Sequence, residues 1–268
     1  MSKQGKALPC APESLFSLHG QVALVTGAAG GLGRAIALAF AQQGADLVLS
    51  DREAADLASV TAQCRQAGVR VAVQAGDLAQ AAQVDALAHG ALQAFGRIDT
   101  LVCNAGMQGP AGPLLDVAED DWARVLQVNL ASAHGLCAAL LPGMAQRGEG
   151  RVILMASIAA LRGNGAIGLY GMSKAALAQL ARNLAVEWGP RGVRANAIAP
   201  GLIRTPLAEG LLADAAFMAR RLAMTPLRRV GEPHEVAGVA VLLAAAAGAF
   251  ITGQTLVVDG GTLISDGS

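Results

Sequence analysis

The sequence predicts an α/β fold in which a single parallel sheet of seven strands carries helices on both faces. Short apolar runs, bounded by glycine or polar residues, alternate along nearly the whole chain with amphipathic stretches of helical length. This alternation is typical of repeated strand–helix–strand units. The composition agrees, because the 268 residues are 53% hydrophobic and 3% aromatic with 33 glycines, which suits close packing of helices on a sheet.

The expected strands are short runs rich in valine, leucine and isoleucine, the composition of strands that are buried on both faces. The first of them, Val22-Ala-Leu-Val-Thr26, lies between Gly20 and Gly27. The seven strands are expected at residues 22–26, 46–50, 69–74, 98–103, 150–156, 193–198 and 256–258.

Helical patterns fill the intervals between these strands. Gly44 and Gly68 end the first two, as glycine commonly does after the last turn of a helix. The stretch 207–223 reads as one or two short helices. The other helices are expected at residues 32–43, 53–67, 81–95, 119–146, 170–188 and 232–247.

The chain is predicted to form one domain over residues 19–268, because it contains no linker, repeat or low-complexity segment. Residues 1–18, which are rich in serine, proline and lysine, are expected to be a loosely ordered leader. This leader has no apolar signal-peptide core. The longest apolar run, at 236–251, is too short to cross a bilayer. We therefore expect a cytoplasmic protein without a membrane partner.

The charge and cysteine patterns exclude several classes of function. Lys plus Arg number 20 and Asp plus Glu number 20, so no basic excess suggests nucleic-acid binding. The four cysteines contain no C-x-x-C pair, and neither a zinc site nor a disulfide framework is indicated. We expect no metal.

A glycine-rich turn, Thr26-Gly-Ala-Ala-Gly-Gly-Leu-Gly33, joins the first strand to the first helix. Gly27, Gly31 and Gly33 allow a tight turn and a close approach of backbone N–H groups to a pyrophosphate, and Leu32 stands between them. The helix N-terminus adds partial positive charge. Such a turn can also be a simple strand–helix connection, but its place after the first strand favours dinucleotide binding.

Asp51 ends the second strand, 18 residues after Gly33. A carboxylate there can accept hydrogen bonds from the adenosine ribose hydroxyls and would repel a 2′-phosphate. It therefore favours NAD over NADP. The adjacent Arg52 weakens this preference, because a guanidinium could tolerate the phosphate.

Tyr170 is the only tyrosine of the chain, and Lys174 follows it by four residues. Positions four apart share one face of a helix, so the phenol and the ammonium should point into the same space. A nearby positive charge lowers the pKa of a phenol, which predicts that Tyr170 exchanges a proton near neutral pH. Taken alone, the spacing also fits a half-buried aromatic residue beside a surface lysine.

Together these motifs, their order and their spacing resemble the short-chain dehydrogenase/reductase family, in its shorter single-domain branch. The resemblance covers about residues 20–261 and implies a Rossmann-type sheet. It also implies further cofactor contacts, although Cys103 replaces the asparagine that begins one family motif. Those contacts would be Asp77 and Leu78 for the adenine ring, Asn104, Ala105 and Gly106 along the cofactor, and Pro200, Gly201, Ile203 and Thr205 around the nicotinamide.

The resemblance implies a catalytic group of Asn129, Ser157, Tyr170 and Lys174. Tyr170 would be the general base in alcohol oxidation and the acid in carbonyl reduction, while Ser157 hydrogen-bonds the substrate oxygen. Lys174 would hold the nicotinamide ribose and lower the pKa of Tyr170. Asn129 would hold a water of a proton relay. Individually, Ser157 and Asp77 could instead cap helices, Thr205 could be an N-cap, and Asn129 could be a buried hydrogen-bonding residue.

Segments 159–169 and 205–227 should flank the substrate, the second as a mobile lid. An apolar lining predicts a largely apolar secondary alcohol or ketone, and the four arginines near the site are interpreted as solvating helix faces. The lining is expected from Leu202, Leu207, Leu211, Leu212 and Met218, and the four arginines are Arg162, Arg204, Arg220 and Arg221.

The two long helices at 120–146 and 170–188 resemble the pair that forms a dimer interface in this family, and the ending at 253–261 resembles a second interface. A homotetramer is therefore expected. The interface residues predicted on the two helices are Ala133, Leu136, Ala139, Leu140, Ala176, Leu180, Leu184 and Trp188.

Three functions remain open on the sequence. The leading one is an NAD-dependent oxidoreductase that interconverts a secondary alcohol and a ketone. The second is an NADPH-dependent 3-oxoacyl thioester reductase. The third is a non-catalytic protein that senses a dinucleotide.

Overall fold

The computed structural model describes residues 15–266. The predicted leader at 1–18 therefore lies mostly outside the described residues, and its boundary stays a prediction. Leu18 is the exception. Its side chain is 1% exposed and packs in the core, and its backbone N–H donates to the Gln43 carbonyl at 2.8 Å. The anchored part of the chain thus begins at or before this residue.

Seven parallel strands form one sheet in the order β3-β2-β1-β4-β5-β6-β7. The order reverses between β1 and β4, so the chain leaves the sheet in opposite directions on either side of this point, where α/β folds bind ligands. The strands are β1 (Val22–Thr26), β2 (Asp46–Asp51), β3 (Val71–Ala75), β4 (Thr100–Cys103), β5 (Gly150–Met155), β6 (Val193–Pro200) and β7 (Thr255–Val258).

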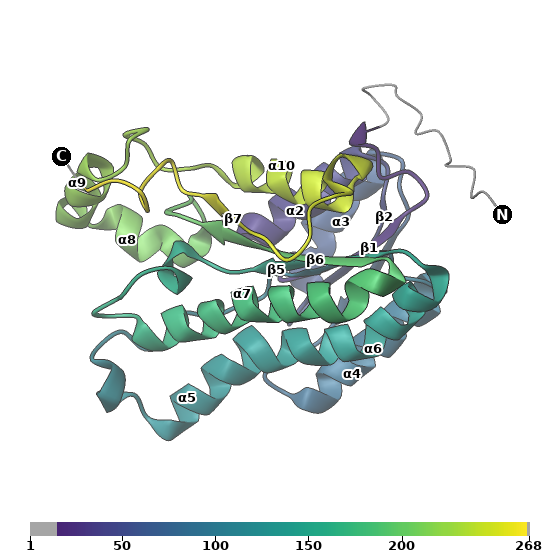
Figure 1. Cartoon of the computed structure of the whole chain (residues 1–268), viewed down its shortest axis with the longest axis horizontal. Coiled ribbons are helices and arrows are strands. Elements are labelled where there is room, and N and C mark those ends of the chain that lie inside the picture. Colours follow the sequence, from purple (N-terminus) through teal and green to yellow (C-terminus); the bar gives the residue numbers. More distant parts are fainter. Residues whose placement is uncertain (1–14, 267–268) are drawn as a thin grey trace.

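Helices cover both faces of the sheet (Figure 1), which confirms the predicted fold class. The helices are α2 (Gly31–Gln42), α3 (Ala58–Gln66), α4 (Ala81–Phe95), α5 (Glu119–Leu126), α6 (Ser132–Arg147), α7 (Gly168–Trp188), α8 (Glu209–Ala213), α9 (Ala215–Ala223) and α10 (Pro233–Ala244). One face packs against α2, α3 and α10, and the other against α4, α6 and α7.

Each face of the sheet has its own hydrophobic core, and successive residues of a strand point alternately into one core and the other. In β1, Leu24 belongs to the α4–α6–α7 side, and its neighbour Val25 belongs to the α2–α3–α10 side. Both side chains are fully buried, which explains why the strand reads as a continuous apolar run.

The predicted helix at 119–146 is interrupted. A π-helical segment, Gln127–Ala131, separates α5 from α6. The stretch 207–223 does divide into two short helices, α8 and α9, after a 3₁₀ turn. A second 3₁₀ turn, Ala54–Leu57, precedes α3 where one continuous helix was predicted. Most other ends differ by one or two residues, which is ordinary at element termini.

Glu119–Arg147 has the length and apolar composition that a membrane-crossing helix would need. Core helices of globular proteins meet the same criterion, and α6 packs on the sheet beside α4 and α7. This composition therefore carries no inference about a membrane.

Candidate active site

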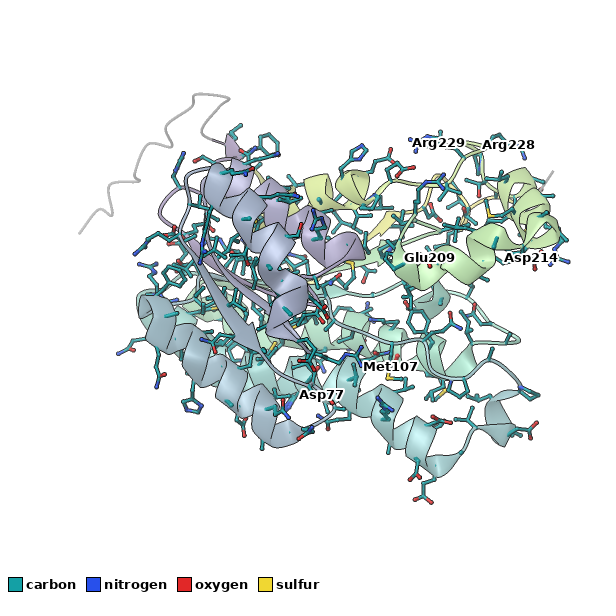
Figure 2. The ribbon with its side chains drawn as sticks, turned by 180° about the vertical axis from the view of Figure 1, so that it is seen from behind. Asp77, Met107, Glu209, Asp214, Arg228 and Arg229 are labelled. Atoms are coloured by element: carbon teal, nitrogen blue, oxygen red, sulfur yellow. The ribbon has the colours of Figure 1, made fainter. Side chains whose placement is uncertain are left out.

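A cavity of about 570 Å³ opens where the carboxyl ends of β1, β2, β4, β5 and β6 meet. It runs from Asp51 and Asp77 at one end, past the glycine turn, to Tyr170 and the segment of α8 and α9. In Figure 2, Asp77 and Met107, which line this cavity, lie below Glu209 of α8 and below Asp214, the residue between α8 and α9. The site therefore uses residues from most of the chain length.

The glycine turn requires glycine at particular positions. Gly27 and Gly31 have positive φ angles of 65° and 53°. A Cβ on Gly33 would lie 2.0 Å from the Gly27 carbonyl oxygen, so α2 can start this close to β1 only with glycine. The N-cap of α2, Gly30, makes no side-chain cap, and its first turn holds no acidic residue. This helix end is therefore suited to a pyrophosphate.

Asn104 ties this turn to β4. Its side-chain amide donates to the carbonyls of Thr26 at 2.9 Å and Gly27 at 3.1 Å. In return, the Thr26 hydroxyl accepts from the backbone N–H groups of Asn104 and Ala105, both at 3.1 Å. The ends of β1 and β4 are thus held in one piece at the point where the strand order reverses.

Asp51 and Asp77 lie at the far end of the cavity. The carboxylate of Asp51 accepts from the backbone N–H of Ala29 at 3.0 Å and of Arg52 at 2.9 Å, which fixes it against the glycine turn. Asp77 accepts from the Ala79 N–H at 3.0 Å. Leu78 and Arg52 also line the cavity. The two carboxylates and Arg52 are therefore the charged groups that a ligand would meet here.

Tyr170, Ser157 and Lys174 meet at the other end. The Ser157 hydroxyl hydrogen-bonds the Tyr170 phenol, and it also accepts from the Ala159 N–H at 3.1 Å. Lys174 is 3% exposed, its Nζ donates to the Met155 carbonyl at 2.8 Å, and it lies 5.6 Å from the centroid of the Tyr170 ring. The predicted i, i+4 alignment of tyrosine and lysine is present on α7.

The expected effect of Lys174 on Tyr170 is not found. Burial raises the pKa of Tyr170 above its ordinary value, and the hydrogen bond from Ser157 lowers it only in part. Burial also lowers the pKa of Lys174 to about 8, which weakens it as a source of positive charge above that pH. In this structure Tyr170 is therefore a protonated phenol at neutral pH, because desolvation of the phenolate outweighs the hydrogen bond from Ser157.

Asn129 lies in the π-helical segment and is 1% exposed. Its side-chain oxygen accepts from the Met107 N–H at 2.8 Å, and its amide donates to the Met107 carbonyl at 2.8 Å and to the Ser173 hydroxyl at 2.9 Å. Ser173 in turn donates to the Tyr170 carbonyl at 2.8 Å. Asn129 therefore joins the loop after β4 to the catalytic helix. The predicted water relay is not tested by these contacts.

The segment after β6 closes the site over the glycine turn. A Cβ on Gly31 would lie 3.4 Å from Thr205, and a Cβ on Gly201 would lie 2.6 Å from the Cβ of Asp259. Pro200, Ile203 and Thr205 line the cavity, as their positions after a strand predict.

Comparison with known proteins gives the family. A family model described as Enoyl-(Acyl carrier protein) reductase matches residues 27–262. Dehydrogenase/reductase SDR family member 4 of Oryctolagus cuniculus is 36% identical over 244 residues, 91% of this chain and 94% of that protein. The chain belongs to the short-chain dehydrogenase/reductase family.

Two solved structures have the same fold as this chain. A gluconate 5-dehydrogenase from Burkholderia cenocepacia J2315, in complex with NADP and tartrate, has a TM-score of 0.90 and 34% identity, covering 95% of this chain and 100% of that one. A 7α-hydroxysteroid dehydrogenase, complexed with NADH and 7-oxo glycochenodeoxycholic acid, has a TM-score of 0.89 and 34% identity, covering 94% and 97%. The protein is thus an oxidoreductase of the short-chain dehydrogenase/reductase family, and these two relatives bind different forms of the dinucleotide.

Two predicted site residues lie behind the wall of this short-chain dehydrogenase/reductase cavity. Gly33 does not line it and serves the close packing of α2 on β1, and Asn129 acts through its contacts with Met107 and Ser173. The sequence analysis missed Ser173, although its place directly before Lys174 on the catalytic helix is a usable signal.

The lining beside α8 and α9 also differs from expectation. Leu202, Leu207 and Leu211 line the cavity, but Leu212 and Met218 do not, and Phe217 takes part instead. Two of the four arginines that were assigned to helix faces, Arg162 and Arg221, line the cavity.

Proposed function

We propose that this protein is an NAD(P)-dependent oxidoreductase, with NAD preferred, that interconverts a secondary alcohol and a ketone. The observation that carries the proposal is the presence of Ser157, Tyr170 and Lys174 in the same cavity as the glycine turn. A pyrophosphate site and a proton-transfer group in a single cavity suit hydride chemistry, and do not suit a protein that only senses a dinucleotide.

The residues around the cavity fit a dinucleotide. The backbone N–H groups at the start of α2 would hold the pyrophosphate, since no side chain or acidic residue competes for them. Asp51 would accept from the adenosine ribose hydroxyls, and its charge supports NAD. When bound, the dinucleotide supplies a nicotinamide that accepts or donates the hydride. Pro200, Ile203 and Thr205 would surround that ring, and Lys174 would meet its ribose.

The chain's own residues move the proton. In ketone reduction, the Tyr170 phenol donates its proton to the substrate oxygen, which suits the raised pKa that keeps it protonated at neutral pH. The Ser157 hydroxyl, already hydrogen-bonded to Tyr170, donates to the same oxygen as negative charge develops there. In alcohol oxidation, Tyr170 must first lose its proton, so oxidation should accelerate as the pH rises.

The Tyr170→Phe variant tests this mechanism. It removes the proton donor and keeps the ring, so kcat for ketone reduction should fall by about 10²- to 10⁴-fold while NADH affinity changes little. Turnover is followed by NADH absorbance over a panel of secondary alcohols and ketones, after NADH and NADPH have each been titrated into the wild-type protein. NADH should bind more tightly.

The matched control is Arg182→Ala, which changes an exposed residue of the same helix and should leave turnover unchanged. Full activity of Tyr170→Phe would disprove the role of the phenol. Equal or tighter binding of NADPH would disprove the preference for NAD. Tight NADH binding without turnover of any alcohol or ketone would favour the sensor.

A further inference from the structure

Two arginines from separate segments face the substrate end of the cavity. Arg162 lies in the loop after β5, and Arg221 lies near the end of α9. Among residues 15–266, none of the ion pairs within 4.0 Å includes either of them. Their guanidinium groups are thus placed in a cavity wall without a carboxylate at contact distance.

Arg221 is incompletely satisfied. One of its terminal nitrogens, Nη1, is buried and has no hydrogen-bond partner. The guanidinium stacks 5.3 Å from the centroid of the Phe217 ring, one turn earlier on α9. A buried donor without an acceptor is costly, so a ligand acceptor that reached this nitrogen would gain a favourable hydrogen bond.

The charged groups around Arg221 also favour an anionic ligand. Burial lowers the pKa of Arg221, and the positive charge of Arg162 lowers it further. Asp259 opposes this effect, but its oxygens already accept from the N–H groups of Gly261 at 2.8 Å and Leu263 at 2.6 Å. Arg221 and Arg162 therefore place two positive charges in the cavity wall.

The loop of Arg162 is held against the catalytic helix. The side-chain amide of Asn164 donates to the carbonyls of Ala159 and Arg162, both at 2.9 Å. Gly171, the residue after Tyr170, allows this contact, since a Cβ there would lie 2.9 Å from the Ala159 oxygen. The loop that carries Arg162 is therefore held in place next to Tyr170, the proton donor.

Arg221 is fixed from the other side. Thr225 donates to the Arg221 carbonyl at 2.8 Å, and its hydroxyl also hydrogen-bonds that of Thr262 at 2.8 Å. Leu227 donates its N–H to the Gly260 carbonyl at 3.1 Å. These bonds join the end of α9 to the segment after β7, so the second arginine is also positioned by backbone contacts.

We propose that the substrate carries one carboxylate, which binds Arg162 and Arg221 while its secondary alcohol or ketone carbon lies at Ser157 and Tyr170. This inference rests on the proposed function and names its substrate class. In the oxidation, the alcohol carbon gives a hydride to NAD⁺ and its hydroxyl gives a proton to Tyr170, so that a hydroxy acid and NAD⁺ yield an oxo acid, NADH and one proton. The carboxylate takes no part in the bond changes.

A carboxylate fits better than the alternatives. It accepts bidentate bonds from guanidinium groups, and the Asp259 carboxylate beside Arg221 would repel a phosphate dianion more strongly than a carboxylate of single charge. A carboxylate is compatible with a substrate that is otherwise largely apolar, because Leu202, Leu207 and Leu211 also line the cavity. The molecule we infer is thus an apolar chain with an acidic end.

Calorimetric titration of hexanoate, hexanamide and hexyl phosphate into the full-length protein tests the inference without requiring turnover. Each probe is titrated with and without saturating NADH. Hexanoate should bind and hexanamide should bind at least about tenfold more weakly, since a hydrogen bond to a charged group is worth more than a neutral one. Equal binding of the acid and the amide, or no binding of hexanoate in either state, would overturn the proposal. Tighter binding of hexyl phosphate would overturn the choice of a carboxylate.

Arg162→Ala and Arg221→Ala should each weaken hexanoate by about 10- to 100-fold. Arg220→Ala is the matched control, because this exposed neighbour on α9 lies outside the cavity lining, and it should leave the affinity unchanged. Arg221→Lys keeps the charge and guards against misfolding of the alanine variant, and it should lose less affinity. Unchanged hexanoate affinity in both alanine variants would overturn the proposal.

Turnover separates this inference from the proposed function. The values of kcat/KM are compared for 5-oxohexanoate and its methyl ester, and Arg221→Ala should raise KM for the acid while changing the ester little. Equal kcat/KM for acid and ester, with normal NADH oxidation, would refute the arginine site and leave the oxidoreductase intact. Failure of NADH to bind at all would instead refute the proposed function.

Discussion

Lys174 holds its ammonium where solvent barely reaches it. The side chain is 3% exposed and donates to one backbone carbonyl, and its pKa falls to about 8 because burial penalises the charged form. Below that pH the lysine is protonated in both the folded and the unfolded chain, so the folded state bears the full cost of the buried charge. Between about 8 and the ordinary value of 10.5, the unfolded chain binds more protons, and stability therefore rises with pH.

We predict that Lys174→Met is more stable than the wild-type protein at pH 7, by about 1–3 kcal/mol, and inactive. The gain is the removed cost of the charge, less the lost hydrogen bond to the Met155 carbonyl. Urea unfolding at pH 7 and pH 10.5 measures it. The difference should shrink at the higher pH, where the lysine is neutral in the folded state and about half protonated in the unfolded chain. If the variant were less stable than wild type at pH 7, the prediction would be wrong, because the ammonium would then stabilise the folded state.

The sequence places Tyr170 and Lys174 on one helical face, because their spacing of four residues is local geometry. It does not predict the direction of the Tyr170 pKa shift. That direction depends on how deeply the other elements bury the phenol, and burial prevails over the hydrogen bond from Ser157. Likewise, Arg162 and Arg221 are 59 positions apart, and only the folded chain shows that they share a wall.

Among the elements, the π-helical segment Gln127–Ala131 has the most direct link to the site. Its Asn129 side chain makes three hydrogen bonds, two to Met107 and one to Ser173. Ser173 passes the contact to the backbone of Tyr170 at 2.8 Å. The π turn thus directs a buried amide toward the loop after β4 and toward α7, and π turns are frequent at functional sites.

Asn129→Ala should lower the free energy of unfolding by about 2–4 kcal/mol, because it leaves the half-buried backbone N–H and carbonyl of Met107 without these partners. Urea unfolding measures this, and faster hydrogen exchange of the Met107 amide reports the specific loss. Because Asn129 is a positioning residue here, kcat should fall more than KM rises. The control is Asn183→Ala, which removes an exposed hydrogen bond between two side-chain amides of α7 and should lower the free energy of unfolding far less. Wild-type exchange at Met107 in the Asn129 variant would contradict this role.

Sequence periodicity identifies the elements but not this interruption. The apolar positions from 119 to 146 fit one long helix, because a π turn of five residues shifts the pattern by about one position. The unfavourable helix propensity of Asn129 is the only local hint, and propensity is a weak signal. The division of 207–223 into α8 and α9 is easier to foresee, since Asp214 caps the second helix by accepting from the Phe217 N–H at 2.9 Å.

At the scale of the whole molecule, the arrangement of layers determines which apolar side chains are buried and which are exposed. Several residues that were predicted at an interface, such as Ala133, Leu136 and Leu140, are instead buried in the core between the helices and the sheet. The exposed apolar side chains lie elsewhere. Val186 on α7 is 79% exposed, and Phe250, which follows α10 on the opposite layer, is fully exposed. Apolar side chains exposed on two different layers suggest two separate contacts between copies.

We therefore predict that the protein is a homotetramer, with a native mass of four chains of 26.9 kDa, by light scattering after size exclusion. Two different twofold contacts produce a closed assembly of four, and a buried carboxylate should break either one. Val186→Glu and Phe250→Glu should each give particles of two chains, and the double variant single chains. Gln63→Glu, on the exposed face of α3, should stay tetrameric. A wild-type protein that elutes as one chain at micromolar concentration would contradict the assembly. Loss of both contacts from one substitution would mean that the two surfaces belong to a single interface.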